Sequence, residues 1–94
     1  MPEQQRERRE VVFRGTVQGV GFRFTTQRIA AQRSVTGFVE NLPDGGVRLV
    51  VEGTAPQIKG VVDAIHEVFG DYIQRTEQSN CPATGEFAHF SIRH

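Results

Sequence analysis

Two glycines and an arginine follow closely on the first apolar stretch of the chain. Gly19, Gly21 and Arg23 stand in the segment VQGVGFRF, which spans residues 17–24. Glycine lets backbone N–H groups approach a ligand, and a planar guanidinium binds phosphate oxygens in a bidentate fork. These residues are therefore suited to holding an anion. The spacing admits a simpler alternative, in which the glycines only turn the chain and Arg23 is a solvated residue.

The sequence does not fit better-known motifs for phosphate chemistry. A dinucleotide-binding fingerprint starting at Gly19 needs glycine or alanine where Phe24 stands, and no GK[ST] of a P-loop is present. A cysteine phosphatase needs arginine six residues after its nucleophile, whereas Phe87 stands six residues after Cys81. Cys81 is therefore expected to be an ordinary thiol.

The three histidines do not form a recognisable metal motif. His66, His89 and His94 lack close ligand spacing with a cysteine or with a second histidine. We therefore expect neither a metal nor a cofactor.

Periodicity places the glycines between a strand and a helix. Alternation over residues 11–17 predicts a strand, and helical spacing over 22–33 predicts a helix that starts beside Gly19 and Gly21. A strand-to-helix junction directs backbone N–H groups outward, as an anion site requires.

The remaining segments predict one more helix and further strands. Strands are expected at 35–41, 47–53, 71–80 and 86–94, and a strongly amphipathic helix at 55–69. The order βαββαβ, with a possible fifth strand, predicts the α+β class. We expect a ferredoxin-like α/β sandwich with an antiparallel sheet of four to five strands and two helices on one face.

Length and charge restrict the function classes. The 94 residues suit a single domain at 11–94, and the charged decamer at 1–10 is expected to be a flexible tail. Eleven Lys and Arg balance eleven Asp and Glu, so no overall charge attracts nucleic acid or a membrane. One cysteine and no apolar run of about 20 residues favour a soluble cytoplasmic protein, which we expect to be a monomer.

Four segments taken together resemble the acylphosphatase family. They are G-x-V-Q-G-V-G-F-R from Gly15, T-G-x-V-x-N-L-P-D-G from Thr36, V-x-x-x-x-E-G from Val47, and T-G-x-F-x-x-F-x-I from Thr84. The resemblance extends from about Val11 to Arg93. It implies the ferredoxin-like fold and the metal-independent hydrolysis of acyl phosphates to a carboxylate and inorganic phosphate.

The resemblance also implies roles for particular residues. Arg23 would bind the substrate phosphate together with the loop amides, and Asn41 would position the attacking water. The phosphate-binding loop would consist of Gln18, Gly19, Val20, Gly21, Phe22 and Arg23. Inorganic phosphate or sulfate is the expected ligand or inhibitor at this site.

Some alternatives and departures remain. Asn41 could simply prepare the turn, although Pro43, Asp44 and two glycines already specify it.

The main rival is a non-catalytic ferredoxin-like module. A phosphate or sulfate sensor would use Arg23 equally well but would not need Asn41. An RNA reader should show exposed aromatics within a basic face, whereas the strand of Phe13 carries only Arg14 as a clear cation. The sequence departs from the usual family pattern at the end of the first helix and in the second strand, namely at Arg33, Ser34 and Phe38.

Overall fold

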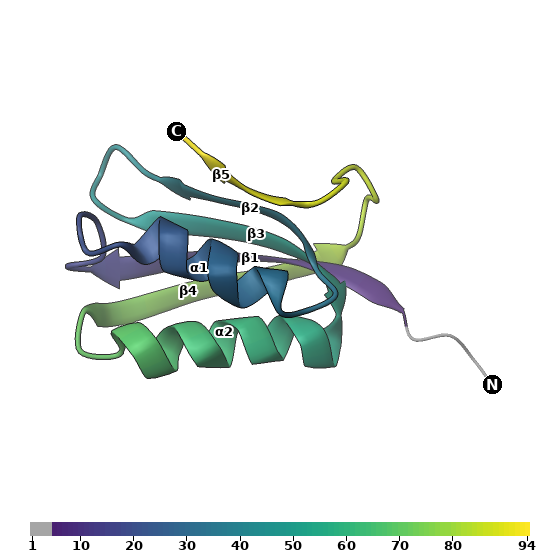
Figure 1. Ribbon diagram of the computed structural model, residues 1–94, viewed down its shortest axis with the longest axis horizontal. Coiled ribbons are helices and arrows are strands. Elements are labelled where there is room, and N and C mark those ends of the chain that lie inside the picture. Colours follow the sequence, from purple (N-terminus) through teal and green to yellow (C-terminus); the bar gives the residue numbers. More distant parts are fainter. Residues whose placement is uncertain (1–4) are drawn as a thin grey trace.

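Two helices cover one face of a five-stranded sheet (Figure 1). The computed structural model describes residues 5–94. The elements in chain order are β1 (Arg6–Gly15), α1 (Phe22–Ala31), β2 (Thr36–Asn41), β3 (Val47–Thr54), α2 (Ala55–Phe69), β4 (Ile73–Pro82) and β5 (Phe90–Arg93). This architecture confirms the predicted ferredoxin-like sandwich. Within the described residues, no helix is long and apolar enough to cross a membrane.

The sheet has the order β4-β1-β3-β2-β5 and is mixed. Its first four strands pair antiparallel, as expected, but β5 lies parallel to β2, with Gly37 opposite Phe90 and Val39 opposite Ile92. The prediction of a purely antiparallel sheet was therefore wrong at this edge. The chain leaves β4 at one edge and crosses the end of the sheet before it enters β5 at the other edge.

The crossing segment between β4 and β5 is held by a buried carboxylate. Glu52 of β3 is fully buried and accepts hydrogen bonds from the backbone N–H groups of Thr84 and Gly85, each at 3.0 Å. The Arg8 Nε of β1 donates to the same carboxylate at 2.8 Å. Two of the sequence motifs, E-G and T-G, are thus joined in one hydrogen-bonded network that anchors β5.

The first strand begins five residues earlier than the sequence predicted. Residues 6–10 were expected to belong to a flexible tail, but all of them pair with β3, and residues 7–10 also pair with β4. Apolar alternation does not reveal this part of β1, because its side chains are charged and find polar partners in the folded protein. Glu10 pairs with Arg48 of β3 at 2.9 Å, and the Arg9 Nε donates to Asn80 Oδ1 of β4 at 2.9 Å. Residues 1–4 of the predicted tail lie outside the described residues.

The hydrophobic core lies between the helices and the sheet. The inward side chains of β1, β2 and β3 meet the apolar face of α2, whose bounds match the predicted 55–69. An aromatic cluster closes one end of this core: the Phe22 ring centroid lies 5.1 Å from that of Phe13 and 4.6 Å from that of Phe69. Phe22 is the first residue of α1, so this cluster fixes where the helix begins.

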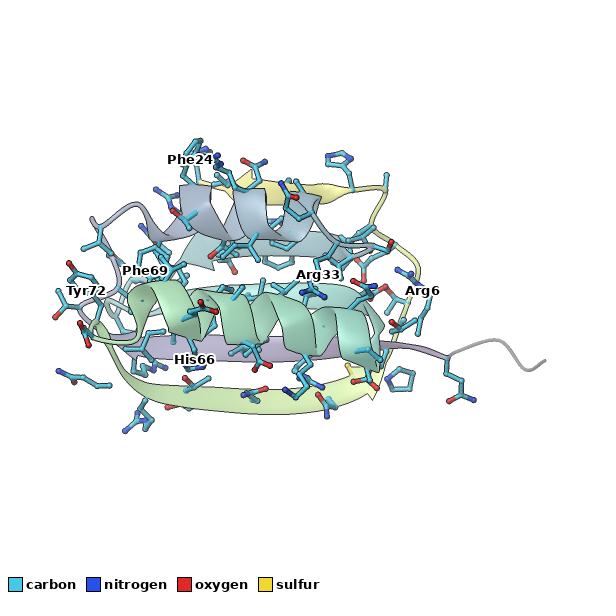
Figure 2. All side chains as sticks on the ribbon, turned by 60° about the horizontal axis from the view of Figure 1, so that its bottom comes forward. Arg6, Phe24, Arg33, His66, Phe69 and Tyr72 are labelled. Atoms are coloured by element: carbon cyan, nitrogen blue, oxygen red, sulfur yellow. The ribbon has the colours of Figure 1, made fainter. Side chains whose placement is uncertain are left out.

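The unusual Arg33 lies at the contact between the two helices (Figure 2). A Cβ atom on Gly60 of α2 would come within 2.3 Å of the Arg33 guanidinium, so the arginine packs directly against that glycine. This departure from the family pattern therefore affects helix packing.

Candidate active site

The loop between β1 and α1 depends on glycine conformations. Gly19 has φ 81° and Gly21 has φ 80°, both in the left-handed region that other residues avoid. A Cβ atom at either position would meet nothing within 4 Å. The backbone conformation, and not a lack of space, is therefore the reason for glycine here.

The start of α1 provides hydrogen-bond donors without acceptors in the helix. Gly21 is the N-cap residue and makes no side-chain cap, and the Thr25 N–H is the donor to the Gly21 carbonyl at 3.0 Å. The first N–H groups of a helix have no intrahelical acceptor and lie at the positive end of the helix dipole. This end of α1 therefore suits an anion.

Arg23 stands at the rim of this helix end. Its neighbour Phe22 is 2% exposed and anchored in the core, whereas Arg23 is half-buried. The Arg23 Nη1 donates to the carbonyl oxygen of Arg93 at 3.2 Å and lies 3.4 Å from Nδ1 of His94. The end of β5 thus restrains the guanidinium at the mouth of the loop.

Asn41 is the last residue of β2 and is exposed to solvent. The turn that follows is closed without its side chain: the Leu42 N–H donates to the Gly46 carbonyl at 2.8 Å, and the Gly46 N–H donates to Asp44 Oδ1 at 3.1 Å. Arg14 pairs with Asp44 at 2.7 Å. The turn therefore has its own hydrogen bonds, which leaves the Asn41 amide available to a ligand.

The side chain of Gln18 connects the loop to this turn. Its Nε2 donates to the carbonyl oxygens of Leu42 at 2.7 Å and Gly46 at 2.9 Å. The sequence had placed Gln18 in the phosphate loop through its backbone amide. The structure shows a further contribution, because the amide side chain holds the loop against the end of β2.

These elements enclose a pocket of about 260 Å³. Of the predicted residues, Gly19, Gly21, Phe22 and Arg23 line it together with Asn41, whereas Gln18 and Val20 do not. Sequence reasoning had not assigned the other lining residues to the site: Val17, Phe24, Ile92 and His94. Ile92 ends the motif that starts at Thr84, but no local pattern places Ile92 or His94 at the site, because the parallel pairing of β5 with β2 brings them there.

The pocket has a local positive charge although the chain as a whole is neutral. Its lining includes the Arg23 guanidinium and no Asp or Glu side chain, and neither α1 nor β5 contains an acidic residue. Among the described residues, no group of three or more His, Cys, Asp or Glu side chains could hold a metal ion. The electrostatics therefore favour an anionic ligand held by the guanidinium and by backbone N–H groups.

Fold and pocket together define a small ferredoxin-like protein with a glycine-containing loop that is suited to an anion. The family model for acylphosphatases matches residues 9–92. An acylphosphatase from Mannheimia succiniciproducens is 35% identical over 88 residues, which cover 93% of this chain and 98% of that protein. Another from Marinobacter nauticus is 38% identical over 81 residues, covering 85% and 88% of the two chains.

A solved structure agrees with these matches. The crystal structure of acylphosphatase from Bacillus subtilis superimposes with a TM-score of 0.84 at 26% identity, covering 94% of this chain and 99% of that one. The chain belongs to the acylphosphatase family, which confirms the resemblance found in the sequence.

Proposed function

We propose that the pocket is the active site at which this chain hydrolyses acyl phosphates. Arg23 and the amides of the loop at 18–23 hold the phosphate, and Asn41 holds the attacking water. Family membership supports the activity. The observation that carries the site assignment is that Arg23, the start of α1 and Asn41 line one pocket, although they come from different elements.

Hydrolysis of an acyl phosphate requires mainly the stabilisation of negative charge on the phosphate oxygens. Water attacks phosphorus, the bond between phosphorus and the carboxyl oxygen breaks, and its electron pair leaves on the carboxylate. The water proton passes to the released phosphate or to solvent. A carboxylate is already a good leaving group, so neither a strong acid nor a covalent intermediate is required. Negative charge spread over the equatorial oxygens is met by the guanidinium fork and by fixed N–H donors.

Asn41 suits the positioning of water because its amide both donates and accepts hydrogen bonds and does not titrate. An oriented water turns a bimolecular encounter into an attack within the bound complex. A phosphate sensor built on Arg23 would use only the N–H donors of this amide, whereas a placed water also needs its carbonyl acceptor. The exposed Asn41 side chain beside the loop therefore favours the hydrolase over the sensor.

An RNA-reading function is not favoured by the outer face of the sheet. Phe38 on β2 is the aromatic that base stacking would require, but it is only 4% exposed. The Arg93 guanidinium covers it at 3.6 Å from the ring centroid, and that of Arg48 lies at 5.7 Å.

We test the function by the release of inorganic phosphate from acetyl phosphate and benzoyl phosphate, with p-nitrophenyl phosphate as the monoester control. Both acyl phosphates should be hydrolysed and the monoester should not. Exhaustive chelation should leave the rate unchanged, because the proposed site uses no metal. Binding of inorganic phosphate without hydrolysis of either acyl phosphate would favour the sensor instead.

We also propose that the substrate is a small acyl phosphate and that inorganic phosphate or sulfate competes with it for the site. We propose further that the protein is a monomer and that it is located in the cytoplasm. The exposed lone thiol of Cys81 supports the last point, because a reducing compartment keeps such a thiol unpaired. Light scattering of the purified protein measures its mass in solution.

A further inference from the structure

One large apolar side chain of the pocket is unusually exposed. Phe24 follows Arg23 on α1, lines the same pocket and is 60% exposed. Figure 2 shows it on the side of α1 that faces away from α2. The ring is therefore not part of the core, and its packing against the rest of the protein does not explain why a phenylalanine stands there.

The other apolar residues of the pocket offer much less surface to a ligand. Val17 is fully buried, Phe22 is 2% exposed, and Ile92 is partly buried against the core. Phe24 therefore supplies the largest accessible apolar surface at the pocket.

The Phe24 ring also lies beside a cation of its own helix. The guanidinium of Arg28, one helical turn further along α1, lies over the ring at 5.8 Å from its centroid. Residues four apart share one face of a helix, and a cation over an aromatic face is attractive. Such a pair favours one orientation of the ring, which reduces the freedom that the ring loses when a ligand packs against it.

The position of the phosphate determines where the acyl group must lie. With the phosphate at Arg23 and the loop amides, the acyl group extends out of the anion site along the remaining walls of the pocket. We propose that Phe24 is the residue that recognises the acyl group, and that it favours acyl phosphates with a flat apolar acyl group over acetyl phosphate. This inference rests on the proposed function.

The test compares substrates within one variant. kcat/KM is measured for benzoyl, cyclohexanecarbonyl and acetyl phosphate with the parent, Phe24→Ala, Phe24→Leu and a control, Val68→Ala. Val68 is 56% exposed on α2 and does not line the pocket. Expressing each value relative to the parent cancels the different intrinsic reactivities of the three substrates.

We expect Phe24→Ala to lower kcat/KM for benzoyl phosphate about tenfold and that for acetyl phosphate less than about twofold. Phe24→Leu should retain more activity toward the cyclohexanecarbonyl substrate than toward benzoyl phosphate, because it keeps apolar area but loses the flat ring. Inhibition by inorganic phosphate should not change, and Val68→Ala should resemble the parent with every substrate.

Two results would overturn the inference alone. An equal loss for all three substrates would mean that Phe24 acts through Arg23, and no loss for any would make it an ordinary surface residue. If the parent hydrolyses none of the acyl phosphates, the proposed function itself fails and the inference fails with it. The substrate ratios therefore separate the two failures.

Discussion

The Arg23 guanidinium is the single group on which the proposed site depends most. Arg23→Ala and Arg23→Lys should both lower kcat/KM by about 100-fold or more, because lysine keeps the charge but not the fork. Steady-state phosphate release measures this, with Arg75→Lys on exposed β4 as the control. If the lysine variant turned over nearly as fast as the parent, bidentate binding of the phosphate by the guanidinium would be contradicted.

Substitution of Asn41 tests whether this residue acts in turnover or in the binding of phosphate. Asn41→Ala should lower kcat by about 100-fold, because the water is no longer placed, while inhibition by inorganic phosphate stays the same. Competitive inhibition and kcat are measured on the same preparation. If Asn41→Ala retains the parent's kcat, the asparagine is only a turn residue.

Asn41→Asp tests the same position through charge. An aspartate, with a pKa of about 3.9 in its ordinary state, is ionised at pH 7 and repels an anion, but it is neutral at lower pH. Phosphate binding by this variant should therefore be weaker than that of Asn41→Ala at pH 7, and the two should converge below about pH 4. A difference that does not depend on pH would show that the carboxylate does not face the anion.

At the scale of the elements, the site requires the β1–α1 loop and the end of β2 to keep their relative position. The Gln18 side chain is the direct connection, through the carbonyls of Leu42 and Gly46. Leucine has a similar size but donates no hydrogen bond.

We expect Gln18→Leu to cost about 1–2 kcal/mol in the free energy of unfolding, because the carbonyls of Leu42 and Gly46 each lose one of their two donors. kcat should fall further than this stability loss explains, by about tenfold, since Asn41 is no longer held opposite the loop. Urea unfolding and kcat are measured below the unfolding transition, with Gln78→Leu on exposed β4 as the control. Unchanged kcat in a less stable Gln18→Leu would limit Gln18 to a structural role.

At the scale of the whole molecule, Glu52 links β1, β3 and the segment that leads into β5. Burial by itself would raise the pKa of this carboxyl. The hydrogen bonds from the Thr84 and Gly85 N–H groups and from Arg8 outweigh burial and lower the pKa from 4.5 to about 2. Because the pKa is lower in the folded protein, the ionised Glu52 stabilises the fold. This stabilisation is fully present above pH 4.5 and is lost as the pH falls toward 2.

Glu52→Gln should lower the free energy of unfolding at pH 7 by about 3 kcal/mol, because Arg8 loses its buried partner. The difference from the parent should shrink as the pH falls from 4.5 toward 2, where the parent's carboxyl also becomes neutral. Urea unfolding followed by circular dichroism at several pH values measures both effects, with the exposed Glu67→Gln as the control. A difference that stays constant across this pH range would contradict the assigned titration.

The sequence by itself determined the features that depend on neighbouring residues. The helix at 55–69 was predicted with the bounds of α2, because its apolar residues repeat with the helical period. The strand-to-helix junction at Gly19 and Gly21 follows from glycine chemistry. The motifs around Arg23 and Asn41 were specific enough to indicate the family, whose model matches most of the chain.

Only the tertiary structure decided the features that depend on distant partners. Residues 6–10 form a strand because β3 pairs with all of them and β4 with residues 7–10. β5 lies parallel to β2 because the chain crosses the end of the sheet after β4, where Glu52 anchors it. That pairing brings Ile92 and His94 to the pocket. Phe24 belongs to the pocket through the placement of α1 on the sheet. Such contacts join residues far apart in the chain, and local periodicity carries no information about them.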